Sequence, residues 1–202
     1  GEGKTLTAMN LSLAFASLNQ KVLLIGCDLR NPQLHKHIHE DKNQPGLVNF
    51  LVDPTTKWRD SILNKFDNHP THDILLSGSL PPNPLNLINN GNMDILIEQA
   101  KKVYDYIIID SAPTLLVADT KSIYHLADTM VYMTRSGVTE KEILNHIESI
   151  SKENDINIGV VLNGVGEKNA YGYSYGYQYG YGYNYKYSYN YGYGYGYDED
   201  KD

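Results

Sequence analysis

The sequence has a single cysteine, Cys27, so it can form no intramolecular disulfide and is typical of a protein from a reducing compartment. It has no apolar run of about 18 residues, so we expect no membrane-spanning helix in the chain itself. It has no excess of positive charge either, because 17 Lys and Arg oppose 24 Asp and Glu and leave a net charge of −7. Without a basic stripe, a nucleic-acid groove is not expected.

Tyrosine is what the sequence has in excess, and most of it lies near the C-terminus. Fourteen of the 18 tyrosines occupy every second position there, namely Tyr171, Tyr173, Tyr175, Tyr177, Tyr179, Tyr181, Tyr183, Tyr185, Tyr187, Tyr189, Tyr191, Tyr193, Tyr195 and Tyr197. Gly, Ser, Asn, Gln and one Lys separate them, which predicts a disordered, accessible tail over 169–202 with a solvated acidic end. Two interpretations are open: a row of phenols that an enzyme phosphorylates, or an aggregation-prone tract without enzymatic meaning.

The rest of the chain, residues 1–168, is long enough for one domain with a substantial core. Short apolar runs predict strands over 22–25, 74–76, 106–109, 129–133 and 156–162. Helical spacing predicts helices over 4–18, before 53, over 93–103, near 120–126, and over 139–151, the last opened by a capping box of Thr139 and Glu142. This alternation predicts an α/β fold in which helices cover both faces of a parallel sheet, so that ligands bind beyond the carboxyl ends of its strands.

The first residues of the chain match part of a phosphate-binding motif. Gly3, Lys4 and Thr5 correspond to the end of the loop G-x-x-x-x-G-K-[ST]. Such a loop turns backbone N–H groups toward phosphate oxygens, and the helix that follows adds partial positive charge. Lys4 would contact the β- and γ-phosphates, and Thr5 would bind Mg²⁺. The sequence begins in mid-motif, without the preceding strand, so we interpret it as a fragment; GEGKT alone is also compatible with a surface turn.

Two carboxylates follow predicted strands. The strand over 106–109 ends in Asp110, where a carboxylate can hold Mg²⁺ or its water. The strand over 22–25 is followed by Asp28 and Arg30. Asp28 could order the metal or take the proton from an attacking phenol, whose ordinary pKa is about 10. Arg30 could neutralise phosphate charge or pair with Asp28. A strand-end Asp is also common in turns, but the loop and the strand order together favour an NTPase site.

These motifs resemble the bacterial tyrosine kinases of capsule and exopolysaccharide synthesis, the BY-kinases. That family has a Walker A loop, a Walker A′ strand ending like I-D-A-D-x-R, a Walker B strand ending like I-I-I-D, and a tyrosine-rich C-terminal cluster. The resemblance covers residues 1 to about 165 and the tail, and it includes the segments LPPNP at 80–84 and DSAPT at 110–114. The resemblance implies a P-loop NTPase-like fold that uses ATP and Mg²⁺.

The resemblance also assigns roles to residues of this chain. It implies that Lys4, Asp28 and Asp110 are catalytic, with Asp28 as the candidate general base, and that Thr5, Asp28 and Asp110 hold the metal. It assigns the nucleotide to Gly1, Glu2, Gly3, Lys4, Thr5, Leu6, Arg30 and Asn163. In one departure, Gly26 stands where many relatives have the first aspartate of Walker A′, so Asp28 must act without that neighbour.

Residues beyond the last two strands have open interpretations. Asn163 could contact the nucleotide base, as an Asn does in related P-loop ATPases, or could form an Asn-Gly turn. Arg135 could face the nucleotide or a neighbouring subunit, although a surface arginine is the simpler interpretation. His35, His37 and His39 lack ligand spacing with nearby acids, so no metal site is expected there.

We therefore expect a tyrosine autokinase that regulates exopolysaccharide or capsule synthesis and phosphorylates a neighbouring subunit's tail in trans. The resemblance further implies a ring-like homo-oligomer at the cytoplasmic side of the bacterial inner membrane, and a tyrosine phosphatase. It also implies a membrane-embedded polysaccharide chain-length regulator as activator, separate or fused upstream. One alternative is a ParA/MinD-like switch ATPase, whose signature lysine would precede Gly1 and which has no use for a tyrosine row. Another is a degenerate scaffold with an adhesive tail, which the intact motif residues argue against.

Overall fold

The computed structural model describes residues 2–64, 66, 69–113 and 118–166. Gly1 and the whole tyrosine row therefore lie outside the described residues. Residues up to Val165 form one compact unit. None of the helices in the described ranges combines the length and hydropathy needed to cross a bilayer.

A four-stranded sheet forms the centre of this unit. Its order is β2-β3-β1-β4, and its strands are β1 (Val22–Gly26), β2 (Ile62–Leu63), β3 (His72–Leu75) and β4 (Tyr106–Asp110). β1 pairs in parallel with β3 and β4, whereas the short β2 is antiparallel to β3. All five residues of β1 are buried, as the apolar run predicts for a central parallel strand.

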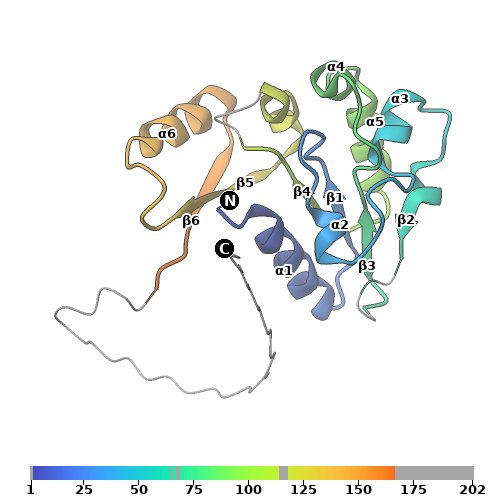
Figure 1. The fold of residues 1–202 in the computed structure, drawn as a ribbon, viewed down its shortest axis with the longest axis horizontal. Coiled ribbons are helices and arrows are strands. Elements are labelled where there is room, and N and C mark those ends of the chain that lie inside the picture. The colour runs from blue at the N-terminus through green and yellow to red at the C-terminus, as the bar shows by residue number, and fades with distance from the viewer. Residues whose placement is uncertain (1, 65, 67–68, 114–117, 167–202) are drawn as a thin grey trace, which may run out of the picture. The chain divides into compact units, whose positions relative to one another are not determined.

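Helices cover both faces of this sheet (Figure 1), which confirms the predicted layering. Alternate residues of β1 point to opposite faces, because successive side chains of a strand do so. Leu23 and Ile25 pack with α3 and α5, whereas Leu24 packs with α1 and α2. The helices are, in chain order, α1 (Lys4–Ser17), α2 (Leu34–His37), α3 (Leu47–Val52), η1 (Trp58–Ser61), α4 (Pro84–Ile88), α5 (Asn92–Ala100), η3 (Ala118–Leu126) and α6 (Ile143–Asn154), η marking 3-10 helices.

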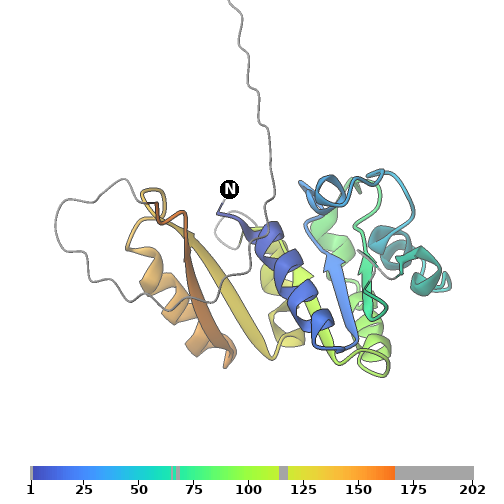
Figure 2. The same ribbon diagram turned by 90° about the horizontal axis from the view of Figure 1, so that it is seen from below.

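Two further parallel strands, β5 (Thr129–Arg135) and β6 (Asn157–Asn163), form a separate ladder. Ile150 of α6 packs against this pair, and α6 lies along it in both views (Figures 1 and 2). Among the described residues, β4 and β5 are not hydrogen-bonded to each other, so the expected parallel sheet is present as two ladders. Glu2, just before α1, is hydrogen-bonded to Asn163 at the end of β6, and it lines a cavity together with residues that follow β4.

The prediction that a capping box at Thr139 opens the last helix was wrong. The helix α6 begins at Ile143, with Glu142 at its N-cap position. The Thr139 hydroxyl instead accepts a hydrogen bond of 2.8 Å from the backbone N–H of Arg135, and the Thr139 N–H donates to the Arg135 carbonyl at 2.9 Å. Thr139 thus closes a turn after β5, and its side chain is not available to cap a helix.

Candidate nucleotide and phosphotransfer site

Gly3 precedes the first turn of α1 and fixes the backbone there. Its φ of +96° lies in the left-handed region that disfavours other residues. A Cβ at this position would also lie 2.4 Å from Nδ2 of Asn163, so a side chain here would be strained and would displace the Asn163 amide. The free N–H groups of a helix N-terminus follow directly, and these are the groups that bind phosphate in such loops.

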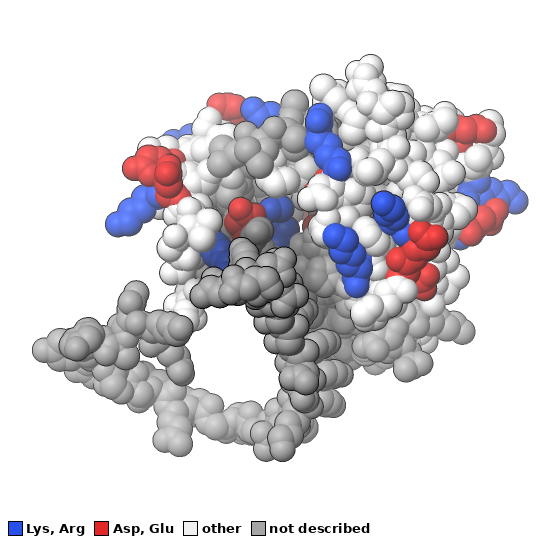
Figure 3. All heavy atoms as spheres, viewed as in Figure 1, with Lys and Arg blue, Asp and Glu red and all other residues white. Residues whose placement is uncertain are grey.

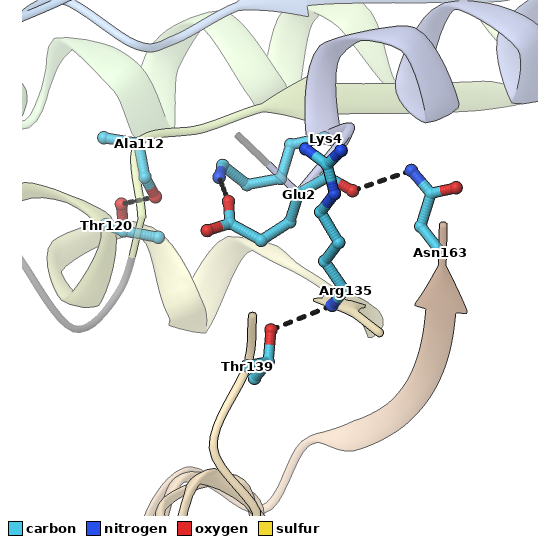
Figure 4. Close-up of polar contacts among 7 residues, drawn as sticks. All are labelled: Glu2, Lys4, Ala112, Thr120, Arg135, Thr139 and Asn163. Carbon is cyan, nitrogen blue, oxygen red and sulfur yellow. Dashed lines mark hydrogen bonds and ion pairs between the residues drawn. The ribbon is translucent and has the colours of Figure 1, made fainter. Parts of the chain in front are cut away.

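Asn163, the last residue of β6, holds the loop from the other side (Figure 4). Its Nδ2 donates to the Glu2 carbonyl at 2.9 Å, and its Oδ1 accepts from the Gly164 N–H at 2.7 Å. The sequence suggested either a base contact or an Asn-Gly turn. The structure shows the turn contact together with an anchoring contact to the loop that sequence reasoning missed.

Lys4 is paired with the carboxylate of Glu2. Their Nζ and Oε2 atoms are 2.6 Å apart, and the two side chains extend together toward Ala112 and Thr120 (Figure 4). The hydrogen bond from Lys4 holds the pKa of the Glu2 carboxyl below its ordinary value. Both residues line a cavity of about 280 Å³ that is otherwise formed by the segment after β4, by β5 and by the start of α6. Thr120 donates to the Ala112 carbonyl at 2.8 Å and so closes the wall after β4.

Asp110 is a buried carboxyl at the end of β4, with 5% of its surface exposed. It lies opposite Gly26 in the parallel register, and its carbonyl accepts from the Cys27 N–H at 2.7 Å. Burial raises the pKa of the Asp110 carboxyl to about 6, with a smaller contribution from the charge of Asp28. A hydrogen bond from Thr5 and the charge of Lys4 oppose that rise. The structure therefore brings together Lys4, Thr5, Asp28 and Asp110.

Asp28 lies in the loop after β1 and is held by that loop's own backbone. Its Oδ1 accepts from the Asn31 N–H at 2.9 Å and from the Arg30 N–H at 3.2 Å. Asp28 and Arg30 are thus in contact through the Arg30 backbone. The Arg30 side chain is exposed, and Leu6 on α1 is 50% exposed. A contact of Arg30 and Leu6 with the nucleotide therefore stays a prediction.

Gly26, where the resemblance implies an aspartate, lies close to its neighbours. A Cβ at Gly26 would lie 3.3 Å from the backbone N of Ser77, closer than most such contacts, and 3.4 Å from Cδ2 of Leu34, an ordinary contact. A side chain at this position would need the Ser77 backbone to give slightly. Glycine is therefore matched to the local packing.

Arg135 at the end of β5 is exposed, which confirms the simpler interpretation of a surface residue. Its side chain extends toward Glu2 and Lys4 (Figure 4), and its Cγ would lie 3.3 Å from a Cβ on Gly164. Arg135 is the register partner of Asn163 in the β5–β6 ladder. Since the ends of paired parallel strands meet at one edge, the predicted strands could have placed these two residues together.

The oxygen donors at this site fit Mg²⁺. Thr5 offers a hydroxyl, and Asp110 and Asp28 offer carboxylates. Magnesium takes one or two carboxylates together with water and substrate phosphates, not a closed cage of protein ligands. No group of three His, Cys, Asp or Glu is gathered in the part of the chain that the structure describes. The loop, the buried strand-end acid and the α/β layers define a P-loop nucleotide-binding domain.

Comparison with known proteins identifies the family. Residues 1–160 match the model of the AAA domain family. The tyrosine-protein kinase YwqD of Bacillus subtilis is 36% identical over 165 residues, which are 81% of this chain and 68% of that protein. A putative tyrosine-protein kinase in the cps region of Klebsiella pneumoniae is 36% identical over 174 residues, 84% of this chain and 23% of that longer protein. The chain belongs to the bacterial tyrosine-protein kinases with an AAA domain.

The solved structures agree with this assignment. The kinase domain of the Escherichia coli tyrosine kinase ETK superposes with a TM-score of 0.75 at 31% identity, over 88% of this chain and 68% of that chain. The septum site-determining protein MinD of Pyrococcus horikoshii, complexed with Mg-ADP, gives a TM-score of 0.64 at 24% identity, over 83% and 68% of the two chains. The second likeness shows the shared fold alone.

Proposed function

We propose that this chain is a kinase domain that transfers the γ-phosphoryl group of Mg-ATP to tyrosines at 171–197 of a neighbouring copy. The observation that carries the proposal is the convergence of Lys4, Thr5 and Asp110 beside Asp28, in a chain that also carries a row of 14 tyrosines. Membership of the tyrosine-protein kinases supports the reaction class.

In this proposal each residue has a defined task. The N–H groups at the start of α1 and the Lys4 ammonium stabilise charge on the transferred phosphoryl group. Thr5 and Asp110 hold Mg²⁺, which when bound neutralises charge on the β- and γ-phosphates. Asp28 orients the attacking phenol and accepts its proton, since a phenol with an ordinary pKa of about 10 is a weak nucleophile at neutral pH.

We assign the domain to capsule or exopolysaccharide synthesis, at the cytoplasmic side of the inner membrane, because a relative is named from a cps region. A ring-like homo-oligomer, a membrane-embedded chain-length regulator as activator and a tyrosine phosphatase belong to the same proposal. Basic and acidic side chains are interspersed over the described part of the face drawn in Figure 3. Such a mixed surface does not favour binding along a nucleic-acid backbone.

The proposal is tested by the intact mass of the full-length protein after incubation with Mg-ATP. We expect a ladder of added phosphates that maps to the tyrosine row and is absent from Lys4→Met. A variant with Phe at all 14 positions should lose the ladder but still turn over ATP. ATP turnover without any added mass, with the activator present, would instead support a switch ATPase of the MinD type.

Transfer between subunits needs its own experiment. An active chain truncated after residue 168 is mixed with a Lys4→Met chain that retains its tail, so that donor and acceptor differ in mass. We expect phosphate on the Lys4→Met chain, in proportion to the amount of truncated enzyme. An unlabelled acceptor, together with self-labelling of the intact chain at a rate independent of dilution, would show that transfer is intramolecular.

A further inference from the structure

Glu2 is an unexpected residue in a loop that binds a polyanion. It directly precedes Gly3 and Lys4, so a negative side chain stands beside the residues that receive phosphate. Its backbone has a separate task, because its carbonyl is held by Asn163 at 2.9 Å. The side chain is not needed for that anchor, and its contacts require another explanation.

The carboxylate of Glu2 is paired with the Lys4 ammonium, which is the side-chain group of the loop that would bind phosphate. Its Oε2 lies 2.6 Å from Nζ of Lys4, a distance typical of a charge-assisted hydrogen bond. Figure 4 shows both side chains on the side of Ala112 and Thr120, whereas Asn163 and Arg135 lie on the other side of Glu2. The Lys4 ammonium is thus directed into the cavity beside β5, with a carboxylate oxygen as its partner.

We propose that Glu2 is an internal competitor for Lys4, which holds the ammonium in the nucleotide-free chain and is displaced when ATP phosphates bind. This inference rests on the proposed function, because it assigns ATP to the loop. Phosphate oxygens and the carboxylate need the same ammonium, and the two anions repel each other when both are near it. Binding of ATP therefore breaks the contact between Glu2 and Lys4 and turns Glu2 outward.

The magnitude of this effect is set by the exposure of the pair. The side chains of Lys4 and Glu2 are 29% and 34% exposed, so solvent screens their attraction. A competitor of this kind lowers ATP affinity several-fold and does not abolish binding. Removing the charge of Glu2 should raise ATP affinity, because it frees Lys4 for phosphate. The loss of a contact that only held the loop in place would lower ATP affinity instead.

The test compares Glu2→Gln with the unchanged full chain by isothermal titration with Mg-ATP. Glutamine keeps the length of the side chain and removes its charge. We expect ATP to bind about three- to ten-fold more tightly to Glu2→Gln, with the larger gain at low ionic strength. Glu148→Gln is the matched control, because Glu148 forms an ion pair with Lys152 on α6, away from the loop. Its ATP affinity should not change.

A second measurement reports on Lys4 without any nucleotide. Brief acylation of lysines, read by peptide mass spectrometry, should label Lys4 faster in Glu2→Gln than in the unchanged chain. Lys152 provides the internal reference, since its labelling should change only in Glu148→Gln. Unchanged or weaker ATP binding in Glu2→Gln, or unchanged Lys4 labelling, would overturn the inference.

The outcomes separate this inference from the proposed kinase activity. Tighter ATP binding without tyrosine labelling in any variant would retain the role of Glu2 and refute the kinase proposal. Tyrosine labelling with unaltered ATP affinity in Glu2→Gln would retain the kinase and refute the role of Glu2.

Discussion

Replacing Asp110 by asparagine should stabilise the nucleotide-free domain at neutral pH. The Asp110 carboxyl is 5% exposed, and burial raises its pKa from an ordinary 3.8 to about 6. Folding therefore costs free energy whenever this group must be ionised. A difference of about 2 in pKa corresponds to about 3 kcal/mol at neutral pH. Asparagine has the same shape, keeps an oxygen that accepts from Thr5, and carries no charge to desolvate.

The sign of the pH dependence follows from proton binding. Between pH 4 and 6, approximately, the folded chain holds a proton on Asp110 that the unfolded chain has released, so the free energy of unfolding falls as pH rises through this window. Below this window Asp110 is protonated in both the folded and the unfolded chain. Above it Asp110 is ionised in both, and folding carries the full free-energy cost of burying its charge. We expect Asp110→Asn to gain about 2–3 kcal/mol at pH 7.5 and little at pH 4.

Urea unfolding followed by circular dichroism, in the absence of Mg²⁺ and nucleotide, measures this difference. Asp60→Asn is the control, because Asp60 is exposed in the 3-10 helix η1 and its replacement should change stability by less than about 0.5 kcal/mol. Equal stabilities of Asp110→Asn and the unchanged chain at both pH values would refute the reasoning that burial dominates at this carboxyl. The same variant should lose tyrosine labelling if Asp110 holds the metal.

Two further predictions follow from the described contacts, and a third follows from the net charge of the sequence. Peptide mapping should find no phosphate on Tyr104 or Tyr124, because the Tyr104 hydroxyl donates to Asp73 at 2.8 Å and Tyr124 is 5% exposed; phosphate there in the folded chain would contradict the geometry. Gly3→Ala should lower the thermal midpoint, since a residue other than glycine in the left-handed region costs about 1–2 kcal/mol and the new Cβ meets Asn163. Adding Asn163→Gly should restore only the part of the loss that comes from this clash. Multiple phosphorylation, at about −1.5 to −2 charges per group, should weaken self-assembly of an already acidic chain; an identical oligomer by sizing before and after labelling would refute this.

Much of the fold could be predicted because its signals are local and strong. The run from Val22 is wholly apolar and becomes the buried centre of the sheet, and the helix that starts at Lys4 begins where the phosphate motif requires it. Asp110 could be placed at the site for the same reason, since its strand is apolar and ends in one acid.

Other features depend on contacts that the sequence pattern does not contain. The short antiparallel β2 has only two residues, too few for any periodicity. The helix α4 starts at Pro84, where the sequence predicts no helix, although Asn83 before it accepts a hydrogen bond from the Asn86 N–H, as an N-cap residue does. The helix predicted over 93–103 ends earlier, at Ala100, and Val103 beyond it is 39% exposed. Its buried face consists of Met93, Leu96, Ile97 and Ala100, which have the spacing of one side of a helix.

The nucleotide-free site contains one unfavourable buried charge and one ion pair that its ligands would replace. The ionised Asp110 carboxylate is buried near the like charge of Asp28, and Glu2 occupies the ammonium that phosphate needs. Asp110 and Asp28 could hold a divalent cation, whose charge would offset both their burial and their repulsion, and phosphate oxygens would then replace Glu2 as the partner of Lys4. Each ligand would thus favour binding of the other. Bound phosphate would add oxygen donors for the cation, and the cation would screen phosphate from the charge of Glu2. Mg²⁺ and ATP should therefore bind cooperatively, and Asp110→Asn at the end of β4 and Glu2→Gln in the phosphate loop should each reduce that coupling.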